Sequence, residues 1–92
     1  MGIFTSSIDR AKLGFVQLKR RADQLKNKKL NREEMVYLFK GVDTASDLFS
    51  EAALVKLNGY LQEFKKIVTK KGRITREADN RLAWIDQNLE QT

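Results

Sequence analysis

The stretch Leu30-Asn31-Arg32-Glu33-Glu34-Met35 decides how this chain of 92 residues divides into helices. Asn31 is a residue type that caps helix N-termini, and Glu34 stands three positions later, where its carboxylate can reach back to the backbone of the capping residue. Leu30 and Met35 can pack against each other across such a cap. The motif therefore predicts a helix that begins just after Asn31 and a connection just before it.

On either side of this motif, apolar residues recur at intervals of three and four, the spacing of one helix face. An N-terminal helix, capped by Ser6 or Ser7, is predicted over residues 7–28 with the stripe Ile8, Ala11, Phe15, Leu18, Ala22 and Leu25. A C-terminal helix is predicted after a cap at Thr75, with the stripe Ala78, Leu82, Ile85 and Leu89. Since the chain contains no proline, few residues interrupt these patterns.

The middle of the chain, residues 35–68, leaves two arrangements open because its apolar face is nearly continuous. It forms either one helix of about 40 residues, ~60 Å long, or two helices separated at Asn58-Gly59. Glycine favours the left-handed conformation just past a helix end, and helices beyond ~25 residues are unusual in compact domains. We therefore favour the break and expect residues 1–92 to form a single all-α domain, a small antiparallel bundle of three to four helices.

The composition excludes several kinds of functional site. There is no cysteine, which excludes disulfides and thiolate metal sites, and no histidine, the usual general acid or base near neutral pH. The paired carboxylates stand at or near helix starts, where capping and the helix dipole explain acidic residues without catalysis. We expect no catalytic centre, no metal site and no cofactor.

No apolar run approaches the ~20 residues that a membrane span needs, and we expect a cytoplasmic protein. The segment Met1-Gly2-Ile3-Phe4-Thr5-Ser6 matches the loose pattern for N-myristoylation. Such matches are common by chance, so the sequence leaves open whether Gly2 is lipidated.

Eighteen Lys and Arg against twelve Asp and Glu give a net charge of +6, which favours anionic partners. In an antiparallel four-helix bundle the first and third connections lie at the same end, so two basic stretches would converge there. The residues expected to contact an anion or nucleic acid are Lys26, Lys28, Lys29, Arg32, Lys70, Lys71, Arg73 and Arg76. A second explanation is that Lys and Arg stabilise the last turns of helices, where they face unpaired carbonyl groups.

Several large apolar residues fall off the predicted stripes, and four of them are the candidates for a protein interface: Leu13, Val16, Tyr37 and Trp84. Either neighbouring helices cover them, or they form an interface with another protein. We expect a small non-enzymatic binding protein, an adaptor, inhibitor or accessory factor of the kind that phages and mobile elements often encode. Another protein is the first expected partner, and phosphate-driven, weakly specific nucleic-acid binding is the alternative. Homodimerisation stays open, because the first helix has heptad-like spacing over only about three heptads.

Overall fold

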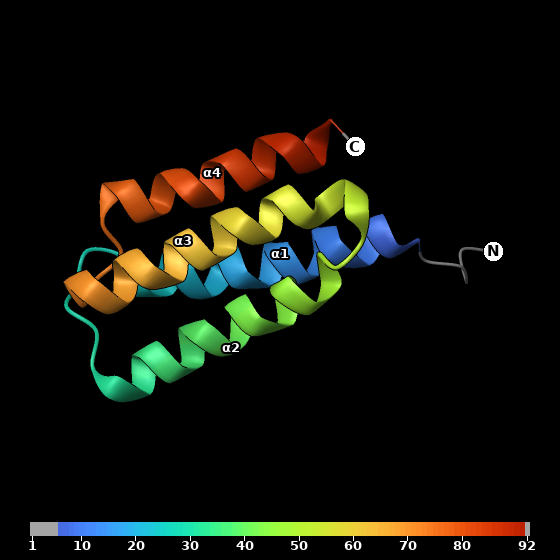
Figure 1. Ribbon diagram of the computed structural model, residues 1–92. Coiled ribbons are helices and arrows are strands. Elements are labelled where there is room, and N and C mark those ends of the chain that lie inside the picture. The colour runs from blue at the N-terminus through green and yellow to red at the C-terminus, as the bar shows by residue number, and fades with distance from the viewer. Residues whose placement is uncertain (1–5, 92) are drawn as a thin grey trace.

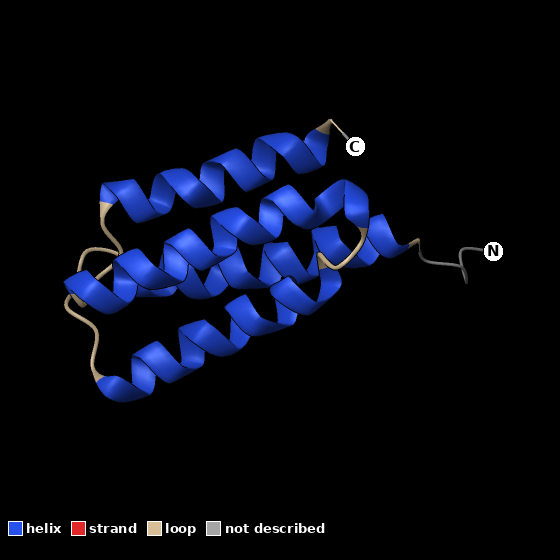
Figure 2. Ribbon diagram, viewed as in Figure 1, coloured by secondary structure: helices blue, strands red, loops and turns tan. Residues whose placement is uncertain are grey.

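The computed structural model describes residues 6–91, which fold as four α-helices that run alternately up and down (Figure 1). The helices are α1 (Ser7–Leu25), α2 (Arg32–Leu48), α3 (Val55–Lys71) and α4 (Arg76–Glu90), with a short 3-10 helix, η1 (Ala52–Leu54), before α3. Figure 2 shows that helices and short connections make up the whole described part of the chain. The predicted all-α antiparallel bundle is therefore confirmed.

The three helix starts lie where the sequence predicts them. The Asn31 side chain accepts a hydrogen bond from the Glu34 backbone N–H at 2.8 Å, and the Glu34 carboxylate accepts one from the Asn31 N–H at 2.9 Å. The Ser6 hydroxyl caps α1 by accepting from the Asp9 N–H at 3.0 Å, and Thr75 caps α4 in the same way. Each cap satisfies backbone donors that a helix start otherwise leaves unpaired.

The predicted break at Asn58-Gly59 is wrong in position, because the middle of the chain is interrupted earlier in the sequence, at residues 49–54. Asn58 and Gly59 lie inside α3. The chain turns where Phe49 and Leu54 both enter the core, and the Phe49 N–H is shared between two carbonyl groups of the last turn of α2. Burial of two large side chains, which depends on the whole bundle, outweighs the local preference of a glycine.

The left-handed helix end that glycine favours occurs instead at Gly72, which ends α3 with φ of 71°. Its N–H donates to the Val68 carbonyl oxygen at 2.8 Å. This residue is followed closely by the cap of α4 at Thr75, so the third connection is short. The shortness of this connection places α4 directly beside α3.

The bundle consists of two helical pairs, α1 with α2 and α3 with α4, which make closer contact within each pair than between pairs. Glycines permit the close approach of α1 and α2: a Cβ atom at Gly14 would lie 2.5 Å from Leu48 Cδ1, and one at Gly41 would lie 3.1 Å from Arg21 Cδ. The core between the pairs contains three fully buried phenylalanines, Phe15, Phe49 and Phe64.

Two glycine substitutions should have opposite effects on stability. Gly59→Ala should raise the free energy of unfolding by about 0.5–1 kcal/mol, because Gly59 is exposed within a helix and nothing lies within 4 Å of an added Cβ. Gly72→Ala should lower it by about 1 kcal/mol, because alanine is strained at positive φ. Urea denaturation of both variants measures the difference, and a stabilised Gly72→Ala protein would contradict the assignment of the helix end.

Candidate functional site

The first and third connections of the chain meet at one end of the bundle. The Leu30 N–H donates to the Gly72 carbonyl oxygen at 2.8 Å. Because this bond joins the peptide unit after Lys29 to the peptide unit before Arg73, the two basic stretches are neighbours in space. We call this part of the molecule the basic end and define it by Lys26, Lys28, Lys29, Arg32, Lys70, Lys71, Arg73 and Arg76.

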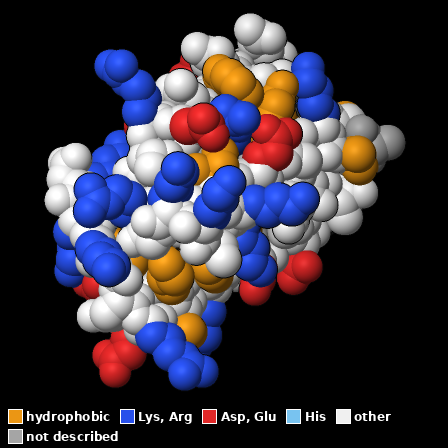
Figure 3. Space-filling view, turned by 60° about the vertical axis from the view of Figure 1, so that its left-hand side comes forward, with side chains coloured by type: hydrophobic (Ala, Val, Ile, Leu, Met, Phe, Trp, Pro, Cys, Tyr) orange, Lys and Arg blue, Asp and Glu red, His pale blue; other side chains and the backbone are white. Residues whose placement is uncertain are grey.

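The basic end lies at the left of Figure 1, where both connections turn. Figure 3 brings that side forward and shows Lys and Arg side chains spread over it, with fewer acidic side chains among them. Acidic residues in the first turns of α2 and α4, among them Glu33 and Glu77, reduce the positive charge of this surface. The positive charge is therefore concentrated at this end but is not uniform.

Two of the eight basic residues are neutralised within the chain. Lys26 Nζ lies 3.1 Å from carboxylate oxygens of both Asp23 and Asp79, so it ties the end of α1 to the start of α4. Partial burial tends to lower the pKa of Lys26, but its bonds to the two carboxylates outweigh this and raise the pKa above its ordinary value. Lys28 pairs with the carboxylate of Glu34, the same residue that completes the cap of α2.

The other six residues of the basic end are exposed and form no ion pair with any residue from 6 to 91. Stabilisation of a helix C-terminus explains only Lys70 and Lys71, which lie in the last turn of α3. Arg32 and Arg76 are the first residues of α2 and α4, where a positive charge opposes the helix dipole. The last turn of α1 contains no basic residue at all. Helix-end stabilisation therefore does not account for most of this charge.

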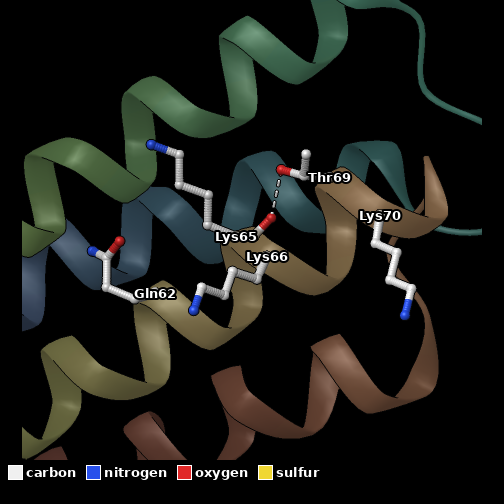
Figure 4. Close-up of a pocket in the computed structure, with 5 residues that line it drawn as sticks. All are labelled: Gln62, Lys65, Lys66, Thr69 and Lys70. Carbon is white, nitrogen blue, oxygen red and sulfur yellow. Dashed lines mark hydrogen bonds between the residues drawn. The ribbon is translucent and has the colours of Figure 1, made fainter.

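A shallow groove extends the basic surface along α3. It has a volume of about 310 Å³ and is lined by Gln62, Lys65, Lys66, Thr69 and Lys70 (Figure 4). Lys65 reaches toward α2, where its Nζ lies 3.5 Å from Asp43 Oδ1 and 5.5 Å from the centre of the Phe39 ring. Lys66 and Lys70 reach away from α2.

Lys66 belongs with the basic end, although the sequence-based set omitted it. It is exposed and forms no ion pair within residues 6–91. The signal that identifies it is its position four residues before Lys70, which places both side chains on one face of α3. Together with the six exposed residues of the basic end, Lys66 makes seven cations that form no ion pair with residues 6–91 and are available to a ligand.

The four off-stripe apolar residues are all substantially exposed, by 59% for Leu13, 43% for Val16, 40% for Tyr37 and 39% for Trp84. The structure does not bring them together. Leu13 and Val16 lie on the solvent face of α1, whereas Tyr37 lies where α2 meets α1, beneath the guanidinium group of Arg21 at 4.4 Å. A single interface that contains all four residues is therefore not present on this surface.

Trp84 lies where α4 meets α3. Its ring packs edge to face with Tyr60 at 5.4 Å between centroids, and the Arg81 guanidinium lies 4.7 Å from its ring centre. Arg81 also donates to the Glu63 carboxylate at 2.9 Å. These contacts fix the orientation of an aromatic surface that is still partly open to solvent.

Among residues 6–91, no three acidic side chains gather in a way that could hold a metal ion. No helix in this part of the chain is long and apolar enough to cross a membrane. The Met1–Ser6 lipidation motif lies almost wholly outside the described residues, Gly2 included. Comparison of the chain with protein-family models, with curated proteins and with solved structures found no significant match.

The cap of α2 makes stability at this end sensitive to acid. The hydrogen bond from the Asn31 N–H, followed by the bond from Lys28, lowers the pKa of Glu34 below its ordinary value of 4.5. A lowered pKa in the folded state contributes stability above the ordinary value, and this contribution is lost as the pH falls through the folded value. Between about pH 6 and pH 3, unfolding free energy should therefore fall less in Glu34→Gln than in the wild-type protein.

Glu33→Gln is the matched control, because it removes the same charge from the same helical turn. Glu33 is exposed and forms no ion pair with residues 6–91. Denaturant titrations at several pH values should give a wild-type pH dependence for Glu33→Gln. Equal changes in the two variants would show that the cap is not the source of the effect.

Proposed function

We propose that the protein is a small non-enzymatic binding protein whose basic end holds the phosphate backbone of a nucleic acid. The observation that carries the proposal is the hydrogen bond between the two connections, which gathers exposed Lys and Arg side chains that have no counterion among residues 6–91. Phosphate groups supply the missing negative charge, and displacement of their bound cations drives association.

The chemistry of the cations fits phosphate groups. Arg32, Arg73 and Arg76 present planar guanidinium groups that can donate two parallel hydrogen bonds to one phosphate, whereas the lysines act as mobile point charges. The transverse dimensions of the molecule are 22 and 17 Å, so this end spans about six base pairs of a duplex at 3.4 Å per step. Contacts to phosphates alone position a protein without reading the bases, so binding should be weakly sequence-specific.

A second candidate function, binding of another protein, is favoured by the aromatic surface formed by exposed Trp84 and half-buried Tyr60. Tryptophan and tyrosine are enriched among residues that dominate protein interfaces. Such an interface would tolerate salt, because its free energy comes from apolar burial, whereas phosphate contacts weaken steeply as salt is added. Four off-stripe apolar residues were predicted from the sequence to form the protein interface. Of these four, only Trp84 supports this second candidate function.

Fluorescence anisotropy with labelled duplex and single-stranded DNA tests the proposal. The protein should bind at 50 mM salt and lose at least tenfold in affinity at 200 mM salt, as expected for several phosphate contacts. Lys70→Gln/Lys71→Gln should weaken binding and reduce the slope of log affinity against log salt concentration by about 2.

The matched control is Lys40→Gln/Lys56→Gln, which removes the same charge from exposed positions away from the basic end. This variant should bind almost as tightly as the wild-type protein and keep its salt slope. An absence of binding at 50 mM salt, or equal losses in both double variants, would contradict the proposal. Retained binding of a protein partner by the Lys70→Gln/Lys71→Gln variant, with loss on Trp84→Ala, would favour the second candidate.

A further inference from the structure

The solvent face of α1 carries a short stripe of four exposed residues: Asp9, Leu13, Val16 and Arg20. Their spacing of four, three and four places all of them within an arc of about 60° on the helix. Neither the Asp9 carboxylate nor the Arg20 guanidinium forms an ion pair with any residue from 6 to 91. The stripe therefore consists of an apolar centre with one unneutralised charge of each sign at its two ends.

The stripe is self-complementary when it is reversed. Asp9 and Arg20 lie equally far from the middle of the stripe, and so do Leu13 and Val16. If a second copy packs its α1 antiparallel about a two-fold axis, Asp9 of each copy faces Arg20 of the other. A parallel arrangement would place like charges opposite each other, which is unfavourable. The order of the charges thus selects one orientation.

The surface beside the stripe has a depression that suits the apolar centre. A groove of about 180 Å³ between α1 and α4 is lined by Lys12, Phe15, Val16, Asp86, Leu89 and Glu90. In the antiparallel arrangement, Leu13 of the second copy lies at the level of Val16, at the edge of this groove. Leu13 is the most exposed large apolar residue within the described part of the chain, so it has the most apolar surface to bury.

We propose that two copies of the protein associate through the solvent faces of α1, antiparallel, with Asp9 and Arg20 paired in both directions around Leu13 and Val16. Because the stripe contributes only two apolar side chains, Leu13 and Val16, we expect the contact to bury less than the ~800 Å² per partner of stable interfaces. The dimer is therefore weak, with a dissociation constant on the order of 100 μM. Because the two α1 helices run in opposite directions, the basic ends of the dimer point away from each other.

Sedimentation equilibrium over about 10 μM to 1 mM protein measures this association. The average mass should rise from the 10.7 kDa of the monomer toward twice that value. Leu13→Gln and Arg20→Glu should each remain monomeric over the same range, because each removes a contact of the proposed interface. Both variants should still fold, since both positions are exposed and lie outside the core. Arg10→Glu is the matched control: it makes the same change of charge on α1 but about 100° from Asp9, and it should dimerise as the wild-type protein does.

A mixture of two variants tests the pairing itself. Asp9→Arg places positive charge opposite Arg20, and Arg20→Glu places negative charge opposite Asp9, so each variant alone should be monomeric. When mixed in equal amounts, the two should form a heterodimer in which both charge pairs are restored. Asp9 also lies in the first turn of α1, so circular dichroism of Asp9→Arg should accompany the experiment.

Three results would overturn the proposal. They are a wild-type protein that stays monomeric at 1 mM, a loss of dimer in Arg10→Glu equal to that in Arg20→Glu, and folded variants that do not associate on mixing. If Asp9→Arg does not fold, the comparison of Arg20→Glu and Leu13→Gln with Arg10→Glu still decides the question. The outcome is independent of nucleic-acid binding, since the stripe contains no residue of the basic end.

Discussion

The hydrogen bond from the Leu30 N–H to the Gly72 carbonyl oxygen is the constraint on which the arrangement of the basic end depends. The fold consists of two helical pairs that pack on each other through the buried core, and several polar contacts also cross from one pair to the other. This bond is one of them, and the ion pairs of Lys26 with Asp79 and Lys19 with Asp86 act at the same boundary. Together they hold the first and third connections side by side, which gathers the basic residues.

The placement of two arginines at this end conflicts with the local preferences of helices, and that conflict is informative. Arg32 and Arg76 occupy first helical positions, where acidic residues are favoured, while the last turn of α1 lacks the basic residue that would suit it. Departures from local rules are expected where a surface serves a ligand. The α1 stripe with Leu13 and Val16 faces another direction, so association of two copies would leave both basic ends accessible.

Features set by neighbouring residues or by the alternating direction of the helices were predictable from the sequence, whereas features set by particular side-chain contacts between helices were not. The caps at Asn31 and Thr75 depend on groups three positions away, and convergence of the basic stretches follows from the alternating direction of the helices. The break near Phe49 depends on burial among all four helices, so the local signal at Gly59 was misleading. Likewise, the neutralisation of Lys26 by Asp79 joins residues of different helices, which no local pattern indicates.

The most direct test of the account is an NMR measurement of the bond between the two connections. We expect a through-hydrogen-bond coupling between the Leu30 amide nitrogen and the Gly72 carbonyl carbon. We also expect slow exchange of the Leu30 amide proton with solvent, although this residue lies outside every helix of the described chain. Absence of the coupling, together with exchange as fast as that of an unstructured peptide, would show that the two connections are not joined. The basic end would then not be a fixed surface.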